Sequence, residues 1–403
     1  MAKPISKSAL YRAIDRIGGP YQFSPALDCP SAGEPTARLD PWNPDGVDYP
    51  DCAGGTATWG YDMSRAWIWG GKACLDEKRG RVVWIGSPHP FDKFGPPPPG
   101  NLISPGNYNS HLTMLWTYTF ADNRLRVYEA PLNSHSERSA DYWPRGVAHT
   151  FDNQCIVGDV LYKATLPVWM NNQPEGEGWK QYHIARIALD RVTNDLASAR
   201  EGAAYIGSFP MSDKKVTAGG MDYIPGWGIF HGHKDRYWRL NPTTGLHTPN
   251  DALGTPLGFA VPTIHNLASY HRDRSQLLYG GGALAGIDGP TGRNLEWITI
   301  DTAGVVRHID RSPVCLSMSE TDIAGEVKGV IVPDPNSREW IGFHDSGVIY
   351  GCDPDRPAGQ HWRVLRTETA QVDIACPLWG MGAILCFKSF RDGGARISAF
   401  RAA

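Results

Sequence analysis

Short runs of alternating apolar and polar residues occupy most of this chain, and the runs come in pairs that are joined by a turn. In each pair an apolar or aromatic run leads into a short turn with Asp or Asn, and the chain then returns. Alternation with a period of two predicts β-strands, and such a turn between two of them predicts an antiparallel hairpin. Five hairpins are predicted, over residues 115–128, 183–194, 235–245, 295–306 and 347–355.

The five hairpins recur at a roughly constant interval. Their turn residues are Asp122, Asp190, Asn241, Asp301 and Asp353, which are spaced 68, 51, 60 and 52 residues apart. A repeat of about 50 residues built from strand–turn–strand units is typical of a β-propeller, in which each repeat forms one radial sheet, or blade. Two more strands precede the hairpin in the clearest repeats, so we expect four antiparallel strands in each blade.

The last repeat lacks one strand. Residues 373–387 and 395–400 contain about three strand-like runs, whereas a blade usually has four. We therefore predict that a strand from about residues 20–40 completes the sixth blade, so that no sheet edge stays open. The expected fold is all-β, a six-bladed β-propeller of four-stranded antiparallel blades. Residues 1–55 are predicted to hold a short helix, an irregular arm and the closing strand, and residues 56–403 the propeller, with approximate blades 56–132, 133–200, 201–250, 251–312, 313–368 and 369–403.

A short amphipathic helix is predicted near the N-terminus. Leu10, Ile14 and Ile17 fall on one helical face, and the run of Gly18, Gly19 and proline then stops the helix. An apolar stripe of this kind needs a surface to cover it. Two interpretations are open: the stripe packs on the protein's own surface, or it is a docking arm for another chain.

Composition narrows the class of protein. The 45 Gly and 32 Pro suit many tight turns, and 15 Trp with 16 Tyr can fill the space between packed sheets. A net charge of -3 offers no electrostatic case for a nucleic-acid partner. No run approaches the roughly 20 apolar residues that span a bilayer, and the first residues are too polar for a secretory signal. We therefore expect a virion or cytoplasmic location without membrane insertion.

The cysteines predict neither a disulfide framework nor a zinc site. Several of the eight lie in strand-like apolar runs, where a thiol behaves as a small hydrophobe, and no Cys-x-x-Cys occurs. Cys29 and Cys52 flank a proline-rich loop and could bridge in an oxidising compartment. Without a secretory signal, we interpret them as reduced.

Three recurring features resemble the repeats of kelch-type propellers, the group that includes the central domain of galactose oxidase. Glycines 280–282 close a central strand, a turn from Asp76 to Gly80 precedes another, and an aromatic residue such as Trp116 or Trp297 opens the next hairpin. The resemblance covers roughly residues 56–403. It implies a propeller fold and no particular activity.

One cluster has the composition of a metal site. His231 and His233 lie two positions apart and are followed by Asp235. In a strand, both imidazoles would share one face and could reach one ion. No third ligand follows from the spacing, so the alternative is that the histidines are ordinary strand-end residues and that the protein holds no cofactor.

The two longest insertions, residues 87–100 and 167–179, are the predicted binding face. Both fall between a central strand and its hairpin, so repeat logic places them on the same face of the disc. The candidate binding residues in them are His89, Phe91, Phe94, Trp169 and Trp179. Exposed tryptophans would stack on sugars, but most tryptophans of a propeller pack between blades.

Function is less specified than fold. The sequence contains no Gly-x-Ser-x-Gly, no His-Glu-x-x-His and no Walker-type loop. We therefore favour a non-catalytic structural or interaction propeller with protein partners, part of a larger assembly such as a phage virion or tail. The alternatives are a glycan-binding, lectin-like propeller and a propeller enzyme, an oxidoreductase or hydrolase with its site at the channel mouth.

Overall fold

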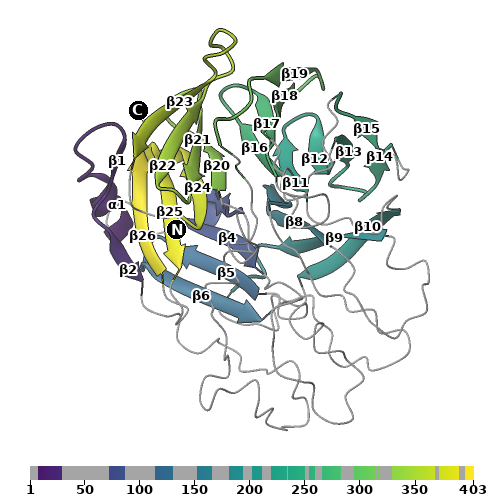
Figure 1. Ribbon diagram of the computed structural model, residues 1–403. Helices are drawn as coiled ribbons and strands as arrows, with labels where there is room; N and C mark the ends of the chain where they lie inside the picture. Colours follow the sequence, from purple (N-terminus) through teal and green to yellow (C-terminus); the bar gives the residue numbers. More distant parts are fainter. Residues whose placement is uncertain are drawn as a thin grey trace, which may run out of the picture.

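Six antiparallel sheets stand around a common axis in a computed structural model of the protein, which confirms the six-bladed propeller (Figure 1). The structure describes residues 8–29, 72–86, 114–129, 152–165, 181–193, 202–210, 219–233, 235–249, 254–258, 266–282, 295–314, 316, 329–367, 372–389 and 395–403.

The first three blades follow one plan, with an inner strand at the axis and three more strands outward. Blade 1 contains β3 (Cys74–Asp76), β4 (Arg81–Gly86), β5 (Met114–Thr119) and β6 (Arg124–Glu129). Blade 2 contains β7 (Gln154–Val157), β8 (Val160–Thr165), β9 (Gln181–Ala188) and β10 (Ala203–Pro210). Blade 3 contains β11 (Gly220–Ile224), β12 (Gly228–His233) and β13 (Arg236–Leu240), with β14 (His247–Thr248) and β15 (Thr255–Pro256) sharing the outer position.

The second half of the ring repeats this plan. Blade 4 contains β16 (Leu267–His271), β17 (Gln276–Gly280), β18 (Trp297–Asp301) and β19 (Val306–Ile309). Blade 5 contains β20 (Gly329–Pro333), β21 (Trp340–His344), β22 (Val348–Cys352) and β23 (Trp362–Thr367). Blade 6 contains β24 (Ile374–Leu378), β25 (Ala383–Ser389) and β26 (Ala395–Arg401).

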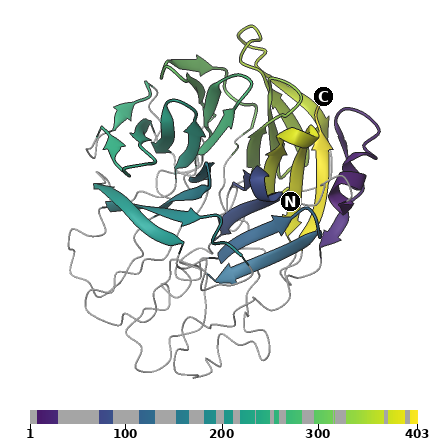
Figure 2. The same cartoon turned by 180° about the vertical axis from the view of Figure 1, so that it is seen from behind.

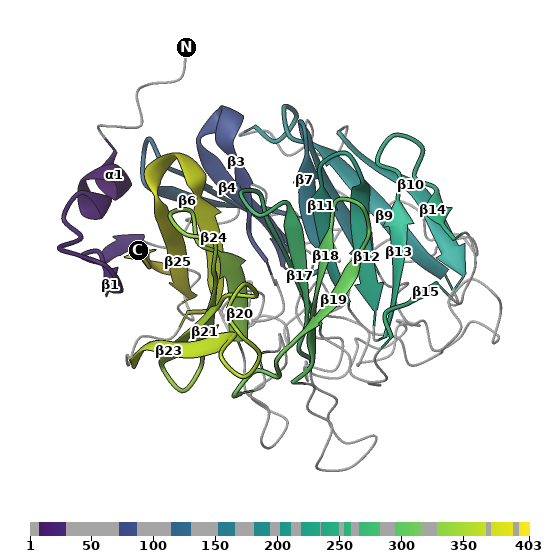
Figure 3. The ribbon, with the colours of Figure 1, turned by 90° about the horizontal axis from the view of Figure 1, so that it is seen from above.

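Each predicted hairpin forms the outer part of a blade, from blade 1 to blade 5. In blades 2, 3 and 5 the returning strand begins several residues after the turn. The inner strands contact one another around the ring in the order β3, β7, β11, β16, β20, β24 and again β3. Figure 3 shows the ring edge-on, with α1 and β1 beside blade 6 at one end and β14 of blade 3 at the other.

The N-terminal segment closes the ring, as predicted. β1 (Gln22–Phe23) and β2 (Leu27–Cys29) both pair antiparallel with β26 and so supply the outer position of blade 6. Between them, the Ser24 hydroxyl accepts a hydrogen bond from Ala399 N at 2.9 Å. From the front and from behind, the purple N-terminal segment lies against the yellow strands of blade 6 (Figures 1 and 2).

The docking-arm interpretation of the N-terminal helix is wrong for its apolar stripe. Ser8 caps α1 (Ala9–Ile14), and Leu10, Ile14 and Ile17 are only 0, 2 and 6% exposed. They belong to a core cluster with side chains of blades 1 and 6. The stripe is therefore covered by the protein's own propeller, because the same segment that donates the closing strands holds the helix against blade 6.

Tryptophans fill the spaces between blades. Trp84 and Trp116 of blade 1 are fully buried, and Trp84 lies 5.3 Å from the ring of Phe387 in blade 6. The indole of Trp340 in blade 5 donates to Ser269 O in blade 4 at 2.9 Å. These contacts join neighbouring blades, which explains why a chain of this fold uses so much aromatic surface.

The cysteines that the structure describes are free and buried, Cys29 among them. Cys52 lies outside the described residues, so the reduced state of the pair Cys29 and Cys52 stays a prediction. None of the helices that the structure describes has the length and apolar character needed to cross a membrane.

Candidate functional site

A cavity of about 760 Å³ lies at one mouth of the central channel. Every inner strand, or the turn that follows it, contributes to its wall. The side chains that matter below are Lys72, Cys74, Asp76, Glu77, Asp222, Tyr223, Tyr270, Arg272 and Trp379. Pockets of this size at the mouths of ring-shaped folds are common ligand sites.

The cavity lies on the face of the disc opposite to the one where the sequence predicts the binding residues. The cavity wall includes the turns between inner and second strands, such as the one after β3. The predicted binding insertions begin at the other ends of the second strands, where Gly86 pairs with Met114 and Thr165 pairs with His183. The insertions and their residues His89, Phe91, Phe94, Trp169 and Trp179 lie outside the described residues.

An ion pair in the wall of the cavity joins two blades that are not neighbours. Lys72 stands just before β3 in blade 1, and its Nζ donates to the Asp222 carboxylate of blade 3 and to Ala268 O of blade 4 at 3.1 Å. Burial alone would lower the pKa of Lys72, but the carboxylates of Asp222 and Asp152 more than reverse this, and the pKa lies above its usual value. The ammonium group therefore stays charged and links three blades.

Asp152 forms a second link between inner strands. It precedes β7, and its backbone carbonyl accepts from Met221 N at 2.9 Å while its carboxylate accepts from Ala268 N. This close approach requires glycine at position 220, because a Cβ there would lie 2.7 Å from the backbone nitrogen of Ala268. Burial raises the pKa of Asp152 to about 7, although Lys72 opposes the effect.

The pKa of Asp152 predicts a specific pH dependence of stability. An unfolded aspartate titrates near pH 3.9, so between about pH 4 and 7 the folded protein binds this proton more tightly than the unfolded chain. The stability contributed by the proton is complete below about pH 4 and is lost as the pH rises through 7. Relative to Asp152→Asn, which keeps an acceptor for Ala268 N, the wild-type protein should lose about 1 kcal/mol per pH unit between pH 5 and 7.

Urea denaturation of both proteins across this range measures the difference. The comparison cancels the titration of the other carboxylates, which both proteins share. Parallel pH profiles for the two proteins would contradict the assignment.

Burial favours the uncharged form of two other titratable groups near the channel. Burial raises the pKa of Cys74 to about 12, and the Cys74 thiol donates to Gln154 O at 3.8 Å. Burial also holds the pKa of Lys163, a fully buried side chain on β8, well below its usual range. The Cys74 thiol is therefore not a nucleophile at neutral pH, since thiolates carry that reactivity.

The rim of the cavity is braced by ion pairs. Arg81 contacts the Asp76 carboxylate at 2.8 Å, and its other nitrogens donate to Leu189 O and Val192 O of blade 2 at 2.6 and 2.5 Å. Arg79 also contacts Asp76, at 3.1 Å. These contacts fix the turn after β3 against the neighbouring blade.

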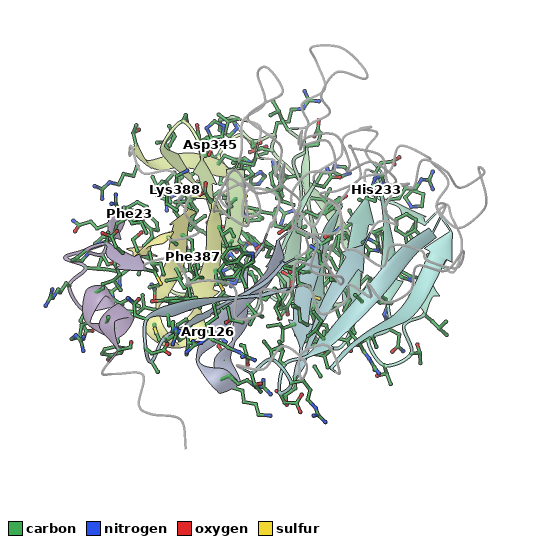
Figure 4. All side chains as sticks on the ribbon, turned by 90° about the horizontal axis from the view of Figure 1, so that it is seen from below. Phe23, Arg126, His233, Asp345, Phe387 and Lys388 are labelled. Atoms are coloured by element: carbon green, nitrogen blue, oxygen red, sulfur yellow. The ribbon has the colours of Figure 1, made fainter. Side chains whose placement is uncertain are left out.

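The predicted metal residues are brought together only in part. His231 is buried on β12 with its ring 5.7 Å from that of His247, a neighbour that the sequence spacing did not indicate. The Asp235 carboxylate lies 4.0 Å from Nε of Arg236 instead. Burial lowers the pKa of His231 and brings that of His247 to about 4. Figure 4 places His233 on the far side of the ring from Phe23 of the closing strand.

Within the part of the chain that the structure describes, no three His, Cys, Asp or Glu side chains form a group that could hold a metal ion. The metal site at His231, His233 and Asp235 stays a prediction that the geometry does not strengthen.

Sequence reasoning missed the cavity residues. The turn from Asp76 to Gly80 was noticed, but as a mark of the fold and not of a site. The usable signal was the repetition of that turn, because Gly80 and Gly382 end equivalent turns in blades 1 and 6 with φ of 60° and 57°. Residues at matching positions of the inner strands lie around the axis at equivalent places, so the turns that follow these strands face a common space.

Comparison with known proteins gives similarities in structure rather than in sequence. No family model matches it, and no curated protein does. The Neurospora crassa Pan2 WD40 domain matches 82% of this chain and 88% of its own, with 8% identity and a TM-score of 0.41. Streptogramin B lyase matches 82% and 94%, with 11% identity and a TM-score of 0.38.

A structural genomics protein of unknown function from Bacteroides thetaiotaomicron VPI-5482 matches 82% of this chain and 70% of its own, with 9% identity and a TM-score of 0.44. Similarities this distant carry no argument about function. The propeller assignment rests on the strand pairing described above.

Proposed function

We propose that this propeller is a non-catalytic interaction module that holds part of a partner protein at the mouth of its channel. The observation that carries the proposal is the cavity, which is bordered by the partly exposed rings of Tyr223, Tyr270 and Trp379. Aromatic side chains with a polar tip are enriched where proteins bind one another.

The bracing of the mouth supports binding. The turn after β3 is held by ion pairs of Asp76 with Arg79 and Arg81, which favour one conformation of this turn before any partner arrives. A preorganised surface loses less conformational entropy on association, which leaves more of the contact energy as affinity.

The charges of the wall also favour binding over catalysis. Asp76 pairs with Arg79 and Arg81, and Asp222 pairs with Lys72. Carboxylates held in such pairs are suited to fixing structure and recognising a ligand, whereas a general acid or base needs a proton that it can exchange. For this reason we prefer an interaction module to a propeller enzyme.

Site-specific photo-crosslinking in the native host tests the proposal. A photoreactive phenylalanine analogue at Tyr270, in the cavity wall, should give a discrete covalent adduct with a protein. The matched control is the same analogue at Val364, which is 59% exposed on the outer strand β23. Adducts from Val364 but none from Tyr270 would overturn the proposal.

The kind of assembly and the subclass of propeller are also proposals. We propose a larger assembly, a phage virion or tail, as the place where the partner is met, supported by the composition and the absence of catalytic motifs noted in the sequence. We likewise propose a kelch-type propeller, supported by glycines 280–282, which close the central strand β17 at its last residue, Gly280, as in that pattern. Co-purification of the protein with assembled particles tests the first of these.

A lectin-like function is the second candidate. Its support is the same trio of aromatic rings, because sugars stack on such surfaces. Trp227 is a weaker contributor, since Arg239 lies over its ring at 5.4 Å. Binding on a glycan array that Trp379→Ala abolishes would favour this candidate.

A further inference from the structure

One side chain spans the channel mouth between three blades. Arg272 starts in the turn after β16 of blade 4, and its guanidinium carbon lies 4.2 Å from the centre of the Trp379 ring in blade 6. Its Nη1 lies 3.6 Å from the Glu77 carboxylate in blade 1, the blade opposite its own. Arg272 therefore crosses the cavity opening, stacked on an aromatic ring and paired with a carboxylate.

This position resembles that of a bound ligand more than that of a structural brace. The side chains of Arg272 and Glu77 are 48 and 59% exposed, so their pairing adds little to the stability of the ring. By contrast, Arg274 two residues later has a fully buried side chain that pairs with Asp353 at 3.2 Å. The chain thus places one arginine as a brace and the other at the open mouth.

We propose that Arg272 occupies the place of an arginine side chain that a partner peptide inserts into the mouth, and that it is an internal competitor for this site. The proposal rests on the proposed interaction function and names the anchor of the partner. The bound arginine would lie on the Trp379 ring and pair with Glu77, while Tyr223 and Tyr270 flank it from the cavity wall.

Charge favours a cationic anchor over an anionic one. If an incoming cation displaces Arg272 from Glu77, the Arg272 guanidinium can pair with Asp273 instead. The Asp273 carboxylate already lies 3.9 Å from Nε of Arg272. For Glu77, the ion-pair partner within the described residues is Arg272. A cation that takes the place of Arg272 therefore leaves both Glu77 and Arg272 paired. An anion in that place would leave Glu77 without a positive partner.

Arginine fits this place better than lysine. A planar guanidinium can stack on an indole and at the same time point its nitrogens at a carboxylate, as Arg272 does, whereas an ammonium group is a compact and strongly hydrated charge.

Calorimetric titration with short peptides tests the inference on the full chain. The probe is a capped pentapeptide of glycine and serine with arginine at its centre, and the comparison peptides carry citrulline, lysine or glutamate there. The arginine peptide should bind, lysine more weakly, and citrulline and glutamate not measurably. Arg272→Gln should tighten the arginine peptide by about two- to fivefold, because the competitor is gone.

Two variants should act in the opposite direction. Trp379→Ala and Glu77→Gln should each weaken the arginine peptide by about two- to fivefold. Because Glu77 is exposed, its variant tests the site even if Trp379→Ala fails to fold. Arg396→Gln is the control: it removes an exposed positive charge from β26, away from the cavity wall, where Arg396 pairs with Asp28 at 3.1 Å, and it should leave the affinity unchanged.

The outcomes separate this inference from the proposed function. If Arg272→Gln weakens the arginine peptide, or if the glutamate peptide binds more tightly, the mouth is not a site for a basic side chain. If no peptide binds while the Tyr270 crosslink persists, the arginine anchor is wrong and the interaction module stands. Absence of the Tyr270 crosslink would instead contradict the proposal that the protein is an interaction module.

Discussion

A protein that lacks residues 1–29 is expected to lose cooperative folding or to melt at least about 10 °C below the full chain. The deletion removes β1 and β2 from blade 6, which leaves the long strand β26 as an open sheet edge. It also removes Leu10, Ile14 and Ile17 from the core, each worth about 1.5–3 kcal/mol. These losses are comparable with the whole free energy of unfolding of a typical domain, about 5–15 kcal/mol.

Scanning calorimetry and light scattering measure this effect, since an open edge should also promote association. A point variant separates the helix from the strands: Ile14→Ala should cost about 2–5 kcal/mol, and Arg16→Ala on the exposed side of the same segment about 0.5 kcal/mol or less. A truncated protein that melts like the full chain would mean that the ring closes without its N-terminal segment.

Breaking the ion pair in the channel should have the second largest effect. Lys72→Met leaves the Asp222 carboxylate without its cation, and removal of one partner of a buried pair typically costs about 3–5 kcal/mol. The side chains of Lys72 and Asp222 are only 13 and 16% exposed, so water compensates little for the lost partner.

A double-mutant cycle with Asp222→Asn isolates the pair. The double variant should be less destabilised than the sum of the two single variants, because Lys72→Met and Asp222→Asn together leave no unpaired charge between them. Chemical denaturation of the four proteins at neutral pH provides the free energies. Additive effects would show that the two groups act independently, and that the three-blade link is not energetically important.

The architecture was readable from the sequence because it repeats. In blades 1 and 4 the hairpin is a local unit whose turn residue, Asp122 or Asp301, lies within a few positions of both strands. The missing strand of blade 6 could be inferred because four strands are needed and only three were available. The closing strands at Gln22–Phe23 and Leu27–Cys29 lie where that reasoning placed them.

The site was not readable in the same way. His231 and His233 do lie on one strand, but the ring of His231 lies 5.7 Å from that of His247, on another strand. The stripe of Leu10, Ile14 and Ile17 indicated only that something covers it. A hydrophobic pattern carries no information on which surface is the cover.

The amino-acid sequence by itself determined the repeat, the number of blades and the need for a shared sixth sheet, because these follow from hydrogen-bonding patterns between neighbouring segments. Only the tertiary structure decided which face carries the cavity and which charges meet there. Lys72 with Asp222, and Glu77 with Arg272, are distant in the chain and adjacent at the axis. Ring closure creates these neighbours, and no local pattern of residues encodes them.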